Sequence, residues 1–256
     1  MSAWQDAAHR QGSYGIRFDW GTRGATAVAA GADVAVVVDV LSFTTTLTVA
    51  LDGGTLVLPY RWNDETAVAY AREHDAVLAV GRSAAEPGGI SLSAASVRAA
   101  EPAARLVLPS PNGSTIAHQL GSGGAECLGA SLRNAAAVAA WIGSHHVTGT
   151  ASVAVIAAGE RWPDGGLRPA LEDLWGAGAV IAGLAAAGWT SLSPEAELAR
   201  VGHAAVRGRE LAALLSCASG RELTDNGYRA DVEIAAEVDR SDVVPILLDQ
   251  RFVDGS

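Results

Sequence analysis

The chain has 256 residues, of which 49% are hydrophobic and 18% are charged, a composition that excludes a disordered protein and supports a sizeable core. Its 18 basic and 28 acidic residues give a net charge of −10, which disfavours nucleic-acid binding because DNA and RNA would be repelled. The longest uncharged stretch near the middle, residues 174–189, holds 16 residues and four glycines, fewer than the roughly 20 apolar residues that span a membrane.

The sequence also lacks the usual signals of export. Residues 1–12 carry charged side chains and no apolar run behind a basic region, so they do not resemble a secretory signal. There are two cysteines, Cys127 and Cys217, and we expect both to be small buried residues without a disulfide. We therefore expect a cytoplasmic protein that binds neither membranes nor nucleic acid.

Short apolar runs alternate with alanine-rich stretches along the chain, a rhythm typical of an α/β fold. Five runs are β-branched or continuously apolar, as strands buried on both faces should be: residues 34–38, 55–58, 76–80, 106–108 and 153–157. Four longer stretches predict helices, with Ser131 and Ser193 as N-caps: residues 63–73, 131–142, 171–187 and 194–215. The sequence therefore predicts one domain, residues 1–256, with a mostly parallel or mixed central sheet and helices on both faces.

Polar side chains follow the first predicted strand. Asp39 closes the run at 34–38, and Ser42, Thr44 and Thr45 stand where a helix begins. In open α/β sheets ligands bind beyond the carboxyl ends of strands, where free amides at helix N-termini favour anions. These hydroxyls and amides suit a phosphate. The alternative, which spacing alone does not exclude, is that Ser42 or Thr44 caps the helix and Asp39 only ends the strand.

A second loop of this kind follows the strand at 106–108. Asn112 and Gly113 predict a turn whose backbone can approach a ligand closely, and Ser114 follows it. Such a turn can form an anion-binding nest, and the alternative is an ordinary Asn-Gly turn with a serine cap. Two such loops in one chain favour phosphate binding.

A third polar segment follows the strand at 153–157. Glu160 and Arg161 lie in a long loop, and Glu172 and Asp173 begin an otherwise apolar helix. Adjacent helical residues lie about 100° apart, so we expect at most one of these two carboxylates to face the sheet while the other caps the helix or faces solvent. If this segment reaches the same strand edge as Asp39, the carboxylates suit Mg²⁺ beside a substrate phosphate, and structural roles are the alternative.

The common dinucleotide, P-loop, nucleophile-elbow and zinc motifs are absent, but several ordered segments resemble a known family. The family pattern D-V-L-R-A-[ST]-T-T is similar to residues 39–46, T-N-G-T to residues 111–114, and E-D-x-x-x-A-G to residues 172–178. Later G-x-x-x-D and V-P segments resemble residues 227–231 and 244–245. From about residue 34 to about residue 248, the chain resembles the 2-phosphosulfolactate phosphatases, the ComB family of coenzyme M biosynthesis.

This resemblance implies a three-layer α/β/α fold and a Mg²⁺-dependent phosphoric monoester hydrolase that acts on a small-molecule phosphate ester. Asp39, Glu172 and Asp173 are the implied catalytic residues, with Asp39 and Glu172 as Mg²⁺ ligands. The implied substrate-binding residues are Ser42, Thr44, Thr45, Arg82, Asn112, Gly113, Ser114 and Arg161. For Arg161 a surface ion pair is the alternative, and a homodimer is expected only because such assemblies are common.

The sequence departs from the family pattern at the first loop. Ser42 stands where the pattern has arginine, which removes a fixed positive charge, and Phe43 replaces a small residue. Arg82 follows Gly81 where the family has glutamate, and we expect Arg82 to compensate for the missing arginine. The alternative function is a non-catalytic or regulatory protein that keeps the anion-binding loops without turnover.

Overall fold

The computed structural model describes residues 8–61, 64–86 and 88–256, so residues 1–7 of the N-terminal segment and residue 63 of the helix predicted at 63–73 lie outside it. The described strands are β1 (Ile16–Trp20), β2 (Val34–Val38), β3 (Leu56–Tyr60), β4 (Val77–Leu78), β5 (Arg105–Pro109), β6 (Glu126–Ala130), β7 (Val153–Ala157), β8 (Glu160–Arg161), β9 (Leu167–Arg168), β10 (Pro245–Leu248) and β11 (Arg251–Asp254). The described helices are α2 (Gly21–Val28), α3 (Phe43–Asp52), α4 (Glu65–Glu73), α5 (Ala94–Ala99), α6 (Gly113–Gly121), α7 (Ala135–His145), α8 (Leu171–Ala186), α9 (Pro194–Ala204), α10 (Glu210–Ser216), α11 (Ala218–Asp225) and α12 (Arg229–Ala235), with one 3₁₀ turn, η1 (Arg82–Ala84).

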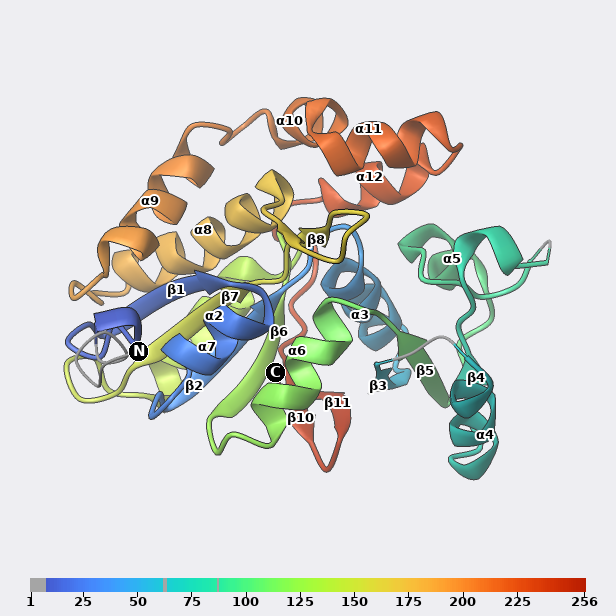
Figure 1. The fold of residues 1–256 in the computed structure, drawn as a ribbon, viewed down its shortest axis with the longest axis horizontal. Helices are drawn as coiled ribbons and strands as arrows, with labels where there is room; N and C mark the ends of the chain where they lie inside the picture. Colours follow the sequence, from blue (N-terminus) through green and yellow to red (C-terminus); the bar gives the residue numbers. More distant parts are fainter. Residues whose placement is uncertain (1–7, 62–63, 87) are drawn as a thin grey trace.

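The main sheet is mixed and consists of two parallel groups joined by a hairpin. Its strand order is β1-β7-β2-β6-β10-β11-β3-β5-β4. Strands β1, β7, β2 and β6 pair in parallel, as do β3, β5 and β4. The antiparallel β10–β11 hairpin, red in Figure 1, pairs with β6 on one side and β3 on the other. This confirms the predicted mostly parallel, mixed sheet.

Helices cover both faces of this sheet, which confirms the three-layer α/β/α fold. Along β2, Val34, Val36 and Val38 join one core cluster, while Ala35 and Val37 join the other. This alternation is the period of two that a strand imposes, and both faces are apolar because both are buried. Helices α7, α8 and α9 contribute to the first cluster, and α2, α3 and α6 to the second.

The predicted strands agree with the structure best at the centre of the sheet. The predictions at 34–38 and 153–157 coincide with β2 and β7, and those at 55–58, 76–80 and 106–108 overlap β3, β4 and β5 with different ends. The sequence does not predict the β10–β11 hairpin. Its turn places Asp249 and Gln250 at positive φ without the Asn-Gly or Asp-Gly pair that usually marks such a turn.

Two helix predictions were wrong in detail. The stretch 194–215 is not one helix, because α9 ends at Ala204 and Gly208 adopts φ +80° before α10 begins. Ser193 does cap α9, since its side chain accepts a hydrogen bond from the Ala196 N–H. Ser131 is not an N-cap, because α7 begins after Asn134, whose side chain accepts a hydrogen bond from the Ser131 N–H.

No helix among the described residues is long and apolar enough to cross a membrane.

Candidate active site

Asp39 lies directly after β2 and is held by the backbone of two separate loops. Its Oδ1 accepts a hydrogen bond from the Phe43 N–H at 3.1 Å, and its Oδ2 accepts one from the Gly113 N–H at 2.9 Å. Phe43 begins α3 and Gly113 begins α6, so the carboxylate joins the N-termini of two helices. Positive helix ends stabilise an anion, and the structure thus brings the first two predicted loops together around one carboxylate.

The contact between these loops requires glycine at position 113. A Cβ atom there would lie 2.6 Å from Asp39 Oδ2 and 2.5 Å from Phe43 Cδ1. The close approach of the backbone to Asp39 is therefore the physical reason for the Asn-Gly turn.

Glu172 and Asp173 are both buried, with relative exposures of 1% and 3%, and α8 has no side-chain cap, so the expectation that one of them caps the helix or faces solvent was wrong. Asp173 Oδ1 accepts a hydrogen bond from the Val40 N–H at 2.7 Å, and Oδ2 accepts one from the Gly159 N–H at 2.8 Å. Asp173 thereby fastens the start of α8 to the loops after β2 and β7. Glu172 is covered from another side, because Cys217 at the start of α11 lies against it.

A close approach of α8 to the sheet makes these bonds possible. A Cβ atom at Gly176 would lie 2.6 Å from Val40 Cγ2 and 2.8 Å from Val38 Cγ1. The helix can therefore rest directly on the end of β2, one turn after Asp173.

Glu172 Oε2 is buried and has no hydrogen-bond partner in the described chain. The neighbouring Cys217 thiol donates to the Leu214 carbonyl at 3.1 Å and not to this oxygen, and burial together with the nearby Glu172 raises the pKa of the thiol to about 12, so it supplies no negative charge. An unpaired buried carboxylate oxygen is costly unless a ligand, ion or water completes it.

Glu160 completes a group of four acidic side chains. It begins the short β8–β9 hairpin, and its Oε2 accepts a hydrogen bond from Asn112 Nδ2 at 3.1 Å. Burial, followed by the negative charges of Asp39 and Glu172, raises the pKa of Glu160 to about 7. We call Asp39, Glu160, Glu172 and Asp173 the carboxylate cluster.

Mutual repulsion and burial also affect the other members of the carboxylate cluster. Burial raises the pKa of Asp39 by more than the backbone hydrogen bonds from Phe43 and Gly113 lower it, and the negative charge of Glu172 raises it further. Burial likewise raises the pKa of Asp173, with Asp39 and Glu172 adding to it. The cluster therefore favours a bound cation or proton, which would relieve this concentration of negative charge.

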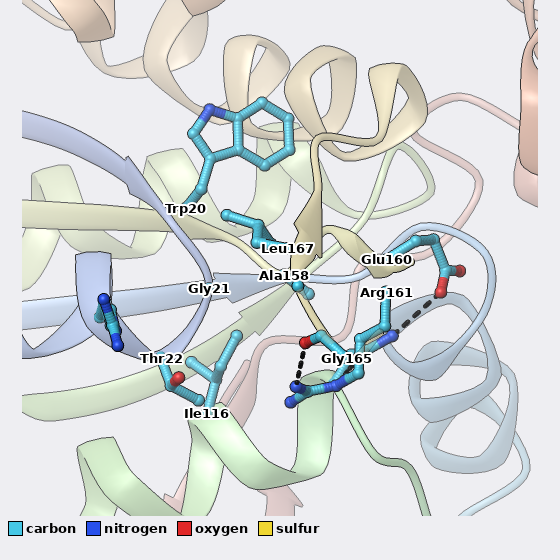
Figure 2. Close-up of a pocket in the computed structure, with 12 residues that line it drawn as sticks. Trp20, Gly21, Thr22, Ile116, Ala158, Glu160, Arg161, Gly165 and Leu167 are labelled. Carbon is cyan, nitrogen blue, oxygen red and sulfur yellow. Dashed lines mark hydrogen bonds between the residues drawn. The ribbon is translucent and has the colours of Figure 1, made fainter. Parts of the chain in front are cut away.

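One cavity of about 370 Å³ opens beside the carboxylate cluster at the β8–β9 hairpin, and we call it the hairpin cavity. Figure 2 shows Glu160 and Arg161 on one side of it and Trp20 and Thr22 on the other. Arg161 is exposed; its Nε donates to Asn112 Oδ1 at 3.2 Å and its Nη1 to the Gly165 carbonyl at 3.4 Å. Within the part of the chain that the structure describes, Arg161 forms no ion pair with an acidic side chain.

A second cavity, of about 800 Å³, is lined by Arg82, and we call it the Arg82 cavity. Arg82 Nε donates to Asp231 Oδ2 at 3.0 Å, and its Nη2 donates to Ser42 Oγ. The guanidinium therefore reaches the Asp39 loop, and its positive charge acts on Asp39, where it opposes the increase in pKa.

Three predicted phosphate-binding hydroxyls are turned toward the backbone instead. Thr44 Oγ1 donates to the Asp39 carbonyl, Thr45 Oγ1 to the Val40 carbonyl and Ser114 Oγ to the Leu108 carbonyl. All three side chains are buried, so they stabilise the loops in this structure, and their predicted contacts with substrate stay predictions. The structure thus brings together Asp39, Ser42, Arg82, Gly113, Glu172 and Asp173, with Asn112 and Arg161 at the hairpin cavity.

Two residues at this site have roles that the sequence did not assign. Glu160 is the first acidic residue after β7, and this position after a strand end could have identified it from the sequence. Asp231 pairs with Arg82 across 149 positions, so only the tertiary structure brings them together. Its one signal was the similarity of residues 227–231 to the G-x-x-x-D segment.

The donor set of the carboxylate cluster fits a hard divalent cation. Glu172 Oε2 lacks a partner, and carboxylate oxygens are ligands that Mg²⁺ prefers. No three acidic, histidine or cysteine side chains within residues 8–61, 64–86 and 88–256 are arranged to hold one ion together. A Mg²⁺ ion would therefore use one or two protein carboxylates, and water or substrate oxygens would complete its shell.

Comparison with known proteins agrees with the geometry. Residues 24–250 match the family model described as 2-phosphosulpholactate phosphatase. A protein of Thermus thermophilus named probable 2-phosphosulfolactate phosphatase is 34% identical over 220 residues, covering 84% of this chain and 88% of its own length. A protein of Deinococcus radiodurans with the same name is 32% identical over 223 residues, with the same two coverages. The chain belongs to the 2-phosphosulfolactate phosphatase family, a family of phosphoric monoester hydrolases.

Proposed function

We propose that the protein is a Mg²⁺-dependent phosphatase that hydrolyses the phosphate monoester of a small acidic hydroxy acid, with 2-phosphosulfolactate as the expected substrate and coenzyme M biosynthesis as the expected context. The observation that carries the metal dependence is the buried Glu172 Oε2 without a partner, close to the charge of Asp39. The cytoplasmic location and the homodimer stay predictions.

Asp39 and Glu172 are the residues proposed to hold Mg²⁺. When bound, Mg²⁺ would polarise the phosphoryl oxygens and offset their negative charge. Asp39 is already oriented by the Phe43 and Gly113 amides, so little reorganisation would accompany binding.

Asp173 has a positioning role in this proposal. Its two oxygens accept backbone hydrogen bonds from Val40 and Gly159, so the side chain joins the start of α8 to the loops after β2 and β7. Its task would be to hold Glu172, the preceding residue, at the end of β2.

Glu160 is the proposed proton donor to the leaving alcohol oxygen. A carboxyl with a pKa of about 7 is partly protonated near neutral pH, which suits a general acid. The Asn112 Nδ2 donor holds Glu160 Oε2 at the hairpin cavity, so the side chain has a defined position.

The alternative of a non-catalytic phosphate-binding protein is not favoured by any of these features. Ser42, the departure that suggested it, lies against the Arg82 guanidinium, so a positive charge is present at this loop.

Phosphate release is the experiment that tests the proposal. The purified protein is given 2-phosphosulfolactate and a panel of small phosphorylated acids, with Mg²⁺ and with a chelator. We expect release that the chelator abolishes and that Mg²⁺ restores. Release that is indifferent to the chelator would refute the metal dependence, and no release from any ester would refute the phosphatase activity.

A further inference from the structure

We propose that the Arg82 cavity binds the second acidic group of the substrate, a carboxylate or sulfonate, through the Arg82 guanidinium, while the phosphate lies at the carboxylate cluster. This inference rests on the proposed function and assigns the selectivity of the site to one residue. It makes Arg82 a specificity-determining residue for esters that carry two acidic groups.

The hydrogen bonds of Arg82 leave part of its guanidinium available. Nε donates to Asp231 and Nη2 donates to Ser42, whereas Nη1 has no hydrogen-bond partner among the residues that the structure describes. The side chain is 18% exposed and lines the cavity. A planar guanidinium with free N–H groups is the side chain best suited to a carboxylate or sulfonate.

Asp231 holds this guanidinium in place before any ligand binds. It is 1% exposed, and its Oδ1 also accepts hydrogen bonds from Ser93 Oγ at 2.6 Å and the Ala95 N–H at 2.9 Å. These bonds tie α12 to the start of α5. The Tyr228 ring lies 5.5 Å from the guanidinium carbon and supports it from another side. Because Arg82 is already ordered, binding an anion would cost little side-chain entropy.

The charges around the site explain why a cation is needed there. The carboxylate cluster repels any anionic substrate, and Mg²⁺ at Asp39 and Glu172 would offset this only for the phosphate. The lining of the Arg82 cavity contains two acidic residues, Asp64 and Glu222, and a further cation, Arg61. Arg82 reaches the Asp39 loop through Ser42, so the second acidic group of an ester whose phosphate lies at the carboxylate cluster would be directed to Arg82.

The position of the guanidinium also accounts for Ser42. The resemblance places an arginine at position 42, at the start of α3, whereas this chain brings a guanidinium to the same point from η1. Ser42 is buried and its small side chain leaves room for Arg82, whose Nη2 donates to the Ser42 hydroxyl. Serine at 42 and arginine at 82 are thus complementary.

The test compares two esters in the wild type and in Arg82→Ala. One ester carries a second acidic group, 2-phosphosulfolactate, and the other, ethyl phosphate, carries none. We expect the ratio of kcat/KM for the first ester to that for the second to fall about tenfold or more, mainly through KM, since a charged hydrogen-bond partner is lost. If Arg82 is only structural, both esters lose activity equally and the ratio is unchanged, which would overturn the inference.

Arg229→Ala is the matched control, because Arg229 is on the same helix as Asp231 and forms an exposed ion pair with Glu233. In this variant the ratio of the two kcat/KM values should stay at its wild-type value. A lower ratio would mean that net charge alone sets the selectivity, and would overturn the inference. Asp231→Asn removes the partner of Arg82 Nε and should lower the ratio in the same direction as Arg82→Ala. An unchanged ratio in Asp231→Asn would refute the positioning role of Asp231.

A binding measurement separates this inference from the proposed function. Sulfolactate, the product without its phosphate, is titrated into the wild type and Arg82→Ala by calorimetry, with circular dichroism to verify the fold. Weaker binding to folded Arg82→Ala supports the subsite even if no ester is hydrolysed. Equal binding to both proteins, or binding to neither, would overturn the inference whatever the activity. Should Arg82→Ala fail to fold, Arg82→Lys is used, which keeps the charge but loses the planar fork and should also bind more weakly.

Discussion

Arg82 and Arg161 border the same carboxylate cluster from two different cavities, and the protein holds them in different ways. Arg82 is mostly buried, pairs with Asp231 and reaches Ser42. Arg161 is exposed and donates to the neutral oxygens of Asn112 and Gly165. Both cations were predicted as substrate ligands, but only one is fixed by an ion pair whose acidic partner is itself buried.

The difference shows how burial separates a fixed recognition group from an adaptable one. A buried arginine without an acidic partner would be strongly destabilising, so Arg82 depends on Asp231 and has one defined position. Arg161 is solvated, and its partners among the described residues are the neutral oxygens of Asn112 and Gly165, so it can move at little cost. We therefore expect selectivity to depend on the Arg82 cavity, and the hairpin cavity to contribute mainly through Glu160.

The largest effect should come from the carboxylate cluster itself. Glu172→Gln keeps the size of the side chain but removes the charge of a proposed metal ligand, and should lower kcat at least about 100-fold. Calorimetry with Mg²⁺ should show weaker binding to the variant. Glu233→Gln, an exposed residue paired with Arg229, is the control. Wild-type Mg²⁺ affinity in Glu172→Gln would remove Glu172 from the metal site.

The next effect concerns the Asn112-Gly113 loop, which lies between the hairpin cavity and the Arg82 cavity. Gly113→Ala introduces a Cβ atom against Asp39 and Phe43, so one of the two loops must shift. We expect a loss of about 1–3 kcal/mol in the free energy of unfolding and a lower kcat, because Asp39 loses the Gly113 amide. Chemical denaturation and phosphate release measure the two losses. A variant as stable as the wild type would contradict the close approach.

Moving the guanidinium back to position 42 sharpens the comparison. In Ser42→Arg/Arg82→Ala, the new side chain enters the space that Arg82 leaves, and should recover part of the roughly tenfold selectivity lost in Arg82→Ala. The measurement is the kcat/KM ratio for the two esters. A ratio no better than that of Arg82→Ala would contradict the statement that both positions reach the same point.

Arg161→Ala should have a smaller effect than any change at Arg82. Because Arg161 is exposed and adaptable, we expect kcat/KM for the two-acid ester to change by at most about threefold. The ratio between the two esters is again the quantity measured. A larger fall of the kcat/KM ratio in Arg161→Ala than in Arg82→Ala would mean that selectivity depends on the hairpin cavity and not on the Arg82 cavity.

The last effect is a pH dependence of stability that originates at Glu160. Its pKa is about 7 in the folded protein and 4.5 in an unperturbed carboxyl, so the folded state binds the proton more tightly. This stabilisation is complete below the unfolded pKa and is lost as the pH rises through 7. Without divalent cation, the Tm should therefore fall between about pH 5 and about pH 8. The Tm of Glu160→Gln should fall less over this range. A fall in Tm as large as that of the wild type would contradict the assignment to Glu160.

The sequence predicts the parts of this site that depend on local pattern. Asp39 follows a strand whose valines are buried on both faces, and the Asn-Gly turn marks the second loop, so both were identified from strand ends and turn residues. The pairing of Arg82 with Asp231 depends on helices brought together by the tertiary fold, and no local pattern reports it. The burial of both Glu172 and Asp173 likewise depends on segments distant in sequence, namely the Val40 and Gly159 loops that bond to Asp173 and Cys217 beside Glu172.

The central claim is that Asp39 is part of a metal-dependent phosphatase centre, and the most direct test is phosphate release by Asp39→Asn. The variant keeps the shape of the side chain, and its circular dichroism should match that of the wild type. The account predicts Mg²⁺-dependent release of phosphate from 2-phosphosulfolactate by the wild type and none above background by Asp39→Asn. A folded Asp39→Asn protein that releases phosphate at a near wild-type rate would contradict the account.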